Sequence, residues 1–256
     1  MTVHEFHEEL TKLFPRSLSA EWDNDGIMVS PDTSAEVGRV LVALDATENV
    51  IKYAAENGFD TVLVHHPMIF GGVRSVTRTS FAGKRIISAI ESGVSVISLH
   101  TRLDAGDGGV NDSLLAALGL TPCGKLGNPE YPDIGRIAET KPMSARELAA
   151  LIKDKLGCRA VRLTGDGDRI VHRLGVCSGA GGDLLWDAID AGCDVFLTGE
   201  CGYNKTEDAT EDGIVTIEAG HFFTENPVCA VLASLAGKIA GAETEIIDSD
   251  PSEMII

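Results

Sequence analysis

Short apolar segments alternate with amphipathic segments along most of the chain, and this alternation restricts the fold more than any other sequence feature. Continuous apolar runs such as Val40–Leu44 and Thr61–Val64 predict strands that are buried on both faces. Segments such as Phe81–Ser92 and Ala145–Leu156 place apolar residues at helical spacing. Because alternating strands and helices favour parallel pairing, the sequence predicts an α/β protein with mainly parallel or mixed sheets flanked by helices.

The same pattern predicts further elements in both halves of the chain. Strands are expected at Val94–Leu99, Ala160–Leu163, Leu174–Cys177, Val195–Thr198, Ile214–Glu218 and Glu243–Ile247. Helices are expected at Asn49–Asn57, Val110–Leu118, Asp183–Ala191 and Asn226–Ile239.

The segment Thr121–Pro142 interrupts this pattern with several prolines and glycines. Such composition is typical of a domain boundary. We therefore expect two layered α/β domains, at about 1–125 and 126–256, with a C-terminal segment that can pack back on the first.

The charge and cysteine content exclude several classes of protein. The 39 acidic and 21 basic residues give a net charge of −18, which repels phosphate backbones and argues against nucleic-acid binding. No run of about 18 apolar residues predicts a membrane span, and the N-terminus lacks the pattern of a signal peptide. The six cysteines form no C-x-x-C pair and are expected to be reduced and mostly buried. We expect a cytoplasmic protein.

Two adjacent histidines, His65 and His66, follow directly on the predicted strand Thr61–Val64. The carboxyl end of a strand is where α/β proteins place their ligands. Because side chains alternate along an extended backbone, the two rings can point in different directions, as one histidine per metal would require. Two hydrogen-bonded histidines in a loop are the alternative, and a lone histidine pair would favour it.

Two further strand ends carry similar residues. His100 and Asp104 follow the strand Val94–Leu99, and His221 and Glu225 follow the strand Ile214–Glu218. If a helix begins near residue 220, His221 and Glu225 share one face of it, about 6 Å apart along the axis. An ordinary surface turn would make their spacing incidental.

Together the three strand ends predict a site with two divalent metal ions. Mixed imidazole and carboxylate ligands suit Zn, Fe, Mn, Co or Ni better than Ca or Mg. A carboxylate can bridge two metals, and Glu225 is the candidate for that position. His4 and His7 lie three residues apart on an acidic N-terminal helix and are expected at the surface.

A glycine-rich turn, Ser178–Asp183, links a predicted strand to a predicted helix. Such a turn can present backbone N–H groups to a phosphate. A tight structural turn capped by Asp183 is an equally good interpretation.

Several short motifs in one order along the chain resemble the NIF-three-like dinuclear metal proteins, also described as GTP cyclohydrolase 1 type 2 homologues. The matching stretches are Trp22-Asp23-Asn24-Asp25-Gly26, Leu44-Asp45-Ala46-Thr47, His65-His66-Pro67 with Ile69-Phe70, Leu103-Asp104-Ala105, Gly109-Val110-Asn111-Asp112, Thr198-Gly199-Glu200, and Gly220-His221 with Thr224-Glu225. They are specific jointly, and they span nearly the whole chain.

The resemblance implies a short family form with two α/β domains, often assembled as a homohexamer. It implies metal ligands at a set of five residues, which are His65, His66, Asp104, His221 and Glu225. It places His100 beside the metals as a neighbour or auxiliary ligand. Many relatives have a histidine shortly after the Thr-Gly-Glu segment, where this chain has Tyr203, and some have one directly after Gly-His, where it has Phe222. These differences put substrate handling in question but leave the ligand set intact.

These observations lead to a hypothesis of a metal-dependent hydrolase that acts on a nucleotide or another phosphorylated small molecule. Glu225 or Asp104 would bridge the metals, and His100 would shuttle a proton, so that His100 and Glu225 are the candidate catalytic residues. Two alternatives stay open at this stage: a non-catalytic metal-binding or metal-delivery protein, and a regulatory scaffold that binds other proteins.

Overall fold

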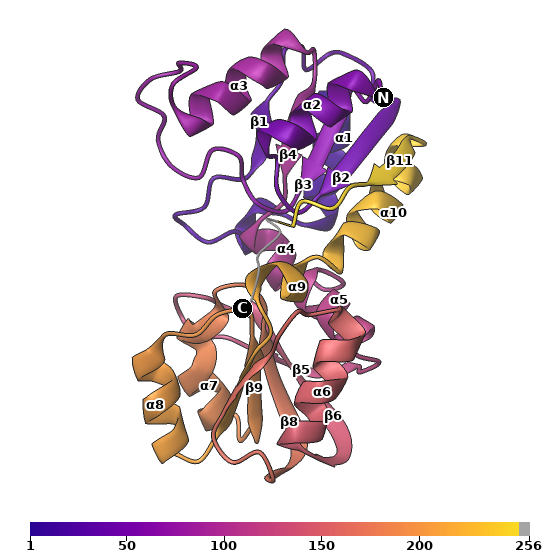
Figure 1. Cartoon of the computed structure of the whole chain (residues 1–256). Coiled ribbons are helices and arrows are strands. Elements are labelled where there is room, and N and C mark those ends of the chain that lie inside the picture. Colours follow the sequence, from indigo (N-terminus) through magenta and orange to yellow (C-terminus); the bar gives the residue numbers. More distant parts are fainter. Residues whose placement is uncertain (251–256) are drawn as a thin grey trace. The chain divides into compact units, whose positions relative to one another are not determined.

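The computed structural model describes residues 1–250, which form two compact units (Figure 1). Within the described residues, unit 1 contains Met1–Leu103 and residues 228–250, and unit 2 contains Asp104–Pro227. The chain passes from unit 1 to unit 2 within the short helix α4, Thr101–Ala105, and returns directly after the helix α9, His221–Glu225. Each unit has its own mixed sheet with flanking helices, so the predicted fold class is confirmed.

Unit 1 is built on a five-stranded sheet in the order β1-β4-β3-β2-β11. The strands are β1 (Gly26–Val29), β2 (Arg39–Ala43), β3 (Thr61–Val64), β4 (Ser95–Ser98) and β11 (Glu243–Ile246). All neighbours pair in parallel except β1, which is antiparallel to β4. Every residue of β3 and β4 is buried, as their continuous apolar character predicts.

The main helices of unit 1 are α1 (Val3–Leu13), α2 (Glu48–Glu56), α3 (Phe81–Glu91) and α10 (Val228–Ala240), with a short 3₁₀ helix, η1, at Arg16–Leu18. Hydroxyl residues cap the first turns of α1, α2 and α3. Thr2 and Glu5 form a capping box at α1, and Thr47 and Ser80 cap α2 and α3. Their apolar faces include Ile51 and Ile86, which join a core cluster with the strands.

Unit 2 is built on a six-stranded sheet in the order β5-β6-β8-β9-β10-β7. The strands are β5 (Pro122–Leu126), β6 (Gly135–Ser144), β7 (Arg162–Thr164), β8 (Ile170–Cys177), β9 (Val195–Thr198) and β10 (Val215–Glu218). The central strands β8, β9 and β10 are parallel, and the other pairs are antiparallel. The proline-rich segment Thr121–Pro142 forms β5 and most of β6.

Most helices of unit 2 are short, and three of them end within one residue of their predicted ends. They are α5 (Val110–Ala117), α6 (Ala145–Leu156), α7 (Leu185–Asp190), α8 (Tyr203–Glu211) and α9, with a 3₁₀ helix, η2, at Gly181–Leu184. Ser144 and Glu147 form a capping box at α6, and Gly157 ends it with a left-handed φ of 69°. Pro227 lies between α9 and α10, so the single helix expected at Asn226–Ile239 begins at Val228 instead.

Two buried arginines fix the loops around α4, each within its own unit. In unit 1, Arg102 donates two hydrogen bonds to Asp25, at 2.8 and 2.9 Å, and both side chains are fully buried. In unit 2, Arg136 donates to Asp112 at 3.0 Å and to the carbonyl of Ala105 at 3.0 Å. Charge-assisted bonds with two donors hold such loops in one orientation.

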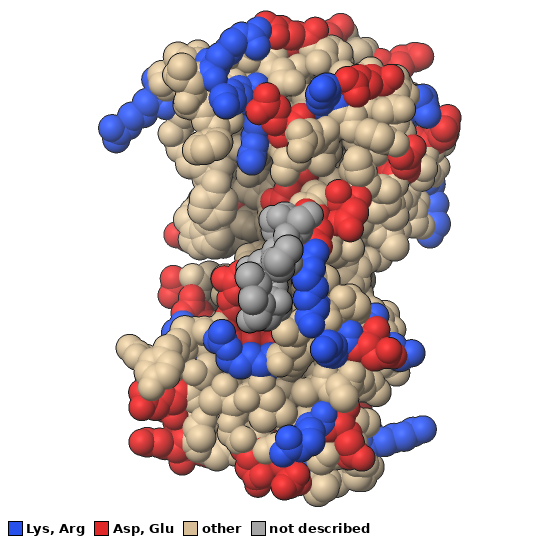
Figure 2. Space-filling model, in the orientation of Figure 1, with Lys and Arg blue, Asp and Glu red and all other residues tan. Residues whose placement is uncertain are grey.

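Most of the cysteines are buried, and charged side chains of both signs lie on the surface. On the face drawn in Figure 2, lysine and arginine side chains are interspersed with acidic ones. Of the six cysteines, Cys123 is exposed, Cys201 is partly buried and the other four are buried. None of the helices within residues 1–250 is both long and apolar enough to cross a membrane.

Candidate metal centre

Unit 1 brings three histidines together at the carboxyl ends of two neighbouring strands. His65 and His66 follow β3, and His100 follows β4, which pairs with β3 in parallel so that Val64 lies opposite Ser98. One ring nitrogen from each histidine lies within 4.8 Å of the others. Because the carboxyl ends of adjacent parallel strands meet at one edge, strand register alone accounts for this cluster.

The Nδ1 atom of each of these histidines lies within hydrogen-bonding distance of an oxygen acceptor. The pairs are His65 with the carbonyl of Leu99 at 3.0 Å, His66 with Asp45 at 2.9 Å, and His100 with Asp23 at 2.8 Å. An acceptor at Nδ1 holds the proton there and leaves the Nε2 lone pair for a metal. The three rings are therefore oriented by acceptors of the kind that lie behind metal-bound histidines.

Asp23 is the best-supported of these acceptors. Its buried carboxylate also accepts hydrogen bonds from the backbone N–H and the hydroxyl of Thr101, at the start of α4. Burial alone would raise the pKa of Asp23, but the hydrogen bonds from His100 and Thr101 outweigh it and lower the pKa to about 2. Asp23 is therefore ionised at neutral pH and fixes the ring of His100.

Unit 2 carries a second group of ligand side chains on α9. His221 and Glu225 lie one helical turn apart, and His221 Nε2 is 3.1 Å from Glu225 Oε2. The Nδ1 atom of His221 lies 3.1 Å from Oε1 of Glu200, so this histidine is oriented as the other three are. A carboxylate oxygen of Asp104 lies within 4.8 Å of one from Glu225.

Glycine at position 179 makes room for Glu225. A Cβ atom on Gly179 would lie 2.0 Å from Glu225 Oε1 and 3.1 Å from His221 Nε2. Gly179 also has a positive φ of 60° and donates its N–H to Thr224 at 3.1 Å. The backbone of this turn is therefore packed directly against the two ligand side chains of α9.

This packing decides between the two interpretations of the glycine-rich turn. Three of its N–H groups donate within unit 2: Ser178 to Asn111 at 2.9 Å, Gly179 to Thr224 at 3.1 Å, and Gly181 to Thr198 at 3.1 Å. Because these donors are occupied, the structure favours a structural turn over a phosphate cradle. Asp183 forms an ion pair with Lys205 and does not cap the helix.

The structure places each candidate from the sequence as follows. His65, His66 and His100 come together in unit 1, and Asp104, His221 and Glu225 belong to unit 2. Sequence reasoning gave no role to the carboxylates that hold the histidines, although each belongs to a recognised motif: Asp23, Asp45 and Glu200.

The N-terminal histidines differ from each other. His4 is exposed, as expected, but His7 is half-buried against Gly26 and was wrongly expected at the surface. Burial lowers the pKa of His7, and the nearby Arg102 adds to this effect.

Several groups of histidine and acidic side chains in the structure could hold a metal ion. Neutral imidazole Nε2 atoms next to carboxylates match Zn, Fe, Mn, Co or Ni, whereas Ca and Mg prefer oxygen ligands alone. The orienting acceptors behind each histidine are the usual companions of metal-bound imidazole. By donor chemistry, the residues present fit a transition-metal site.

A family model described as Duf34/NIF3 (NGG1p interacting factor 3) matches residues 1–253. The chain belongs to the Duf34/NIF3 family. A Clostridium perfringens relative named GTP cyclohydrolase 1 type 2 homolog is 33% identical, with 100% of each chain covered. A Drosophila melanogaster relative named NIF3-like protein 1 is 26% identical, over 95% of this chain and 86% of its own length.

Solved structures show the same Duf34/NIF3 fold. A Staphylococcus aureus protein matches with a TM-score of 0.89 and 26% identity, and covers 100% of this chain and 99% of its own. HcgD from Methanocaldococcus jannaschii, in a reduced form, matches with a TM-score of 0.79 and 26% identity, over 98% of each chain. Family membership, predicted from the motifs, is thus confirmed.

Proposed function

We propose that this Duf34/NIF3 protein binds two divalent transition-metal ions and hydrolyses a nucleotide or another phosphorylated small molecule. The metal ligands would be the five residues His65, His66, Asp104, His221 and Glu225. The names of the bacterial relatives support the nucleotide class.

One observation carries the metal proposal. Four histidines on three different strand ends, His65, His66, His100 and His221, each have an oxygen acceptor within 3.1 Å of Nδ1. A histidine that serves only to hydrogen-bond within a loop has no need of this repeated arrangement. Metal-binding histidines use it to fix ring orientation and tautomer.

Chain continuity supports a shared role for the ligands of the two units. Asp104 follows His100 within a single turn, in which the carbonyl of His100 accepts a hydrogen bond from Leu103 at 2.7 Å. The His221 and Glu225 pair lies within a few residues of Pro227, where the chain returns to unit 1. We propose that both groups of ligands serve one dinuclear centre.

The catalytic proposal rests on His100 and Glu225. When bound, a pair of divalent metals supplies Lewis acidity and lowers the pKa of a water molecule. His100, with Nδ1 held by Asp23 at 2.8 Å, can exchange a proton at Nε2. Glu225 would provide a carboxylate at the reacting water, in a position fixed by the backbone of Gly179.

Metal analysis combined with an activity panel tests this proposal. Elemental analysis of the metal-loaded protein should give two ions per chain, and fewer in His65→Ala and His221→Ala. His172→Ala, which changes an exposed histidine, is the matched control and should keep both ions. His100→Gln should keep the ligand residues but lose roughly 10²–10⁴-fold in phosphate release from the best substrate.

The outcomes separate the alternatives. A protein without stoichiometric metal would contradict the whole proposal. A metal-loaded protein that hydrolyses no nucleotide or phosphodiester in a broad panel would instead support metal delivery or a regulatory scaffold. The homohexamer and the cytoplasmic location stay predictions, which light scattering and cell fractionation can test.

A further inference from the structure

Two aromatic side chains of unit 1 lie exposed beside the histidine cluster. Trp22 is 49% exposed and Phe70 is 63% exposed, and their ring centroids are 5.7 Å apart. Each ring also lies 6.0 Å from the ring of His100, in an edge-to-face arrangement. The aromatic pair therefore borders the cluster while leaving ring surface open to solvent.

The loops that carry these rings are fixed in place. Asn24 donates a hydrogen bond to the carbonyl of Ile69 at 2.6 Å, which joins the loop of Trp22 to the loop of Phe70. Asp23, directly after Trp22, is bound to His100 and Thr101. The position of the two rings relative to His100 thus follows from hydrogen bonds of their immediate neighbours.

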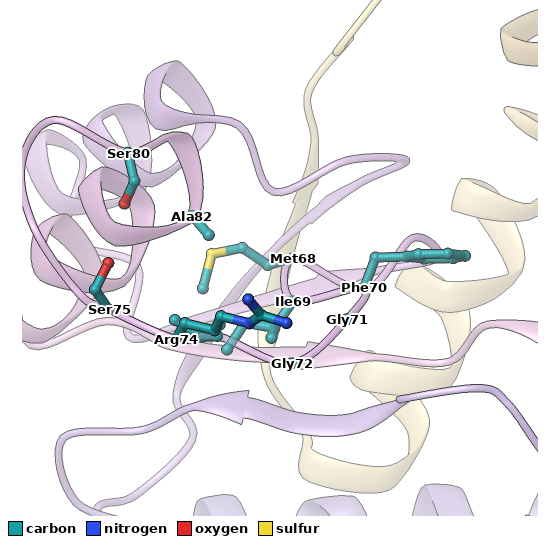
Figure 3. A pocket seen from close by; sticks show the side chains of 10 residues that line it. Met68, Ile69, Phe70, Gly71, Gly72, Arg74, Ser75, Ser80 and Ala82 are labelled. Atoms are coloured by element: carbon teal, nitrogen blue, oxygen red, sulfur yellow. The ribbon is translucent and has the colours of Figure 1, made fainter.

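The aromatic pair lies outside the buried core of unit 1. Core aromatic residues such as Phe6 are fully buried in unit 1, whereas Phe70 lies mostly in solvent. Figure 3 shows the Phe70 side chain pointing away from those of Met68 and Arg74, with which it lines a pocket of about 400 Å³. Large exposed apolar side chains at a site edge are typical of ligand contacts.

The charge of the neighbouring segment indicates what else the ligand carries. Residues 71–85 contain four basic side chains, Arg74, Arg78, Lys84 and Arg85, and no acidic one, in a chain of net charge −18. Arg78 is paired with Glu91, and Arg74 lines the pocket next to Phe70. A local excess of positive charge attracts anions.

We propose that Trp22 and Phe70 stack against the planar aromatic ring of an anionic substrate, such as the base of a nucleotide, and so hold the substrate beside His100. This inference rests on the proposed function, because it takes the site beside His100 as the place of reaction. It goes further by restricting the substrate to molecules with an aromatic ring. Stacking on aromatic side chains is sequence-tolerant and does not specify which base is bound.

Tryptophan fluorescence gives a direct test, because the chain has two tryptophans, Trp22 and Trp186. Trp186→Phe leaves Trp22 as the single emitter, which can be excited at a wavelength where nucleotides absorb little. GMP should quench its emission in a saturable manner. Ribose 5-phosphate, which has no aromatic ring, should not quench it, and guanosine, which has no phosphate, should bind more weakly than GMP.

Matched variants assign the effect to the stacking pair. In the Trp186→Phe protein, Phe70→Ala should raise the Kd for GMP roughly 10-fold, at the low end of what loss of one base-stacking contact costs. Phe81→Ala removes a phenylalanine that is 84% exposed in the same region, and should leave the Kd unchanged. Trp22→Leu should weaken GMP binding similarly, as measured by equilibrium dialysis, with the fold checked by circular dichroism.

Metal content, measured on the same samples, keeps the two proposals separate. Full metal with no saturable quenching would overturn the stacking proposal and leave the metal centre intact. Saturable quenching in a protein that contains no metal would support the stacking proposal and contradict the metal centre. Equal effects of Phe70→Ala and Phe81→Ala on the Kd would also overturn the stacking proposal. If GMP does not bind and Trp22→Leu changes the oligomeric mass, the proposal is overturned as well, and the two rings are instead a contact between copies of the chain.

Discussion

Gly179 lies so close to Glu225 that a Cβ atom on the glycine would be 2.0 Å from the carboxylate oxygen Oε1. We therefore expect Gly179→Ala to displace Glu225 and to lower the affinity for metal by at least 10-fold, since ligand geometry determines binding. The positive φ of 60° adds a backbone cost of about 1 kcal/mol. Competition with a chromogenic chelator measures the affinity, and urea unfolding measures the stability.

Gly192→Ala is the control for that experiment. Gly192 has a φ of 71°, but a Cβ atom there would have no neighbour within 4 Å. It should reproduce the backbone cost and leave metal affinity unchanged. Equal metal affinities in the two variants would show that Gly179 has no part in placing Glu225.

Asp45 holds His66 through a contact of 2.9 Å between Oδ1 and Nδ1. Asp45→Asn replaces the anion with a neutral amide and weakens its hold on the ring. Metal affinity should fall by roughly 10–100-fold, the usual cost of losing such an orienting group. Asp32→Asn, which alters an exposed carboxylate bonded to Ser34 in a local turn, should cause no such change. Titration calorimetry with Zn²⁺ would measure both, and an unaltered affinity in Asp45→Asn would argue against metal at His66.

Arg102 and Asp25 form a fully buried ion pair with bonds of 2.8 and 2.9 Å. Arg102→Leu would leave the carboxylate buried with the weaker support of Arg16 at 2.9 Å and the hydroxyl of Ser19 at 3.2 Å. The free energy of unfolding should fall by about 3–5 kcal/mol, the usual cost of breaking a buried pair. Lys52→Ala breaks an exposed pair with Glu56 and should change it by less than about 0.5 kcal/mol. Urea unfolding measures both variants, and a similar loss of free energy in the two would contradict a stabilising role for the buried ion pair.

Asp194 gives unit 2 a predictable dependence on pH. Burial raises the pKa of Asp194, but hydrogen bonds from the backbone N–H groups of His172 and Arg173, together with Arg169, outweigh it, so the folded pKa lies below the ordinary value. Its contribution to stability is therefore complete above about pH 4 and is lost as the pH falls through the lowered pKa.

Asp194→Asn tests this dependence. At pH 7 the free energy of unfolding of the variant should be about 1–3 kcal/mol lower than that of the wild type, because charge-assisted hydrogen bonds are lost. The difference should shrink in acid unfolding series below pH 4. Asp212→Asn, at an exposed carboxylate that ends α8, should show no comparable change. A difference that is constant with pH would mean that the ionised form of Asp194 is not what stabilises unit 2.

Much of the fold could be predicted, because apolar periodicity reflects burial directly. Thr61–Val64, Ala145–Leu156 and Val195–Thr198 coincide with β3, α6 and β9. The strand β6 was missed, since it contains Pro142, which cannot donate to a ladder. A register shift in its pairing with β8, between Glu139 and Met143, accommodates that proline. Whether such a segment forms a strand depends on packing in the whole sheet rather than on its own residues.

The candidate metal centre, like the fold, could be predicted only in part. The sequence by itself determined that histidines and carboxylates follow buried strands, because strand ends are marked by local apolar runs. Only the tertiary structure decided which acceptors hold the rings: Asp23 reaches His100 across 77 positions of the chain, and Asp45 reaches His66 across 21. Hydrogen-bond partners depend on which strand ends become neighbours in the sheet, and no local pattern encodes that distance.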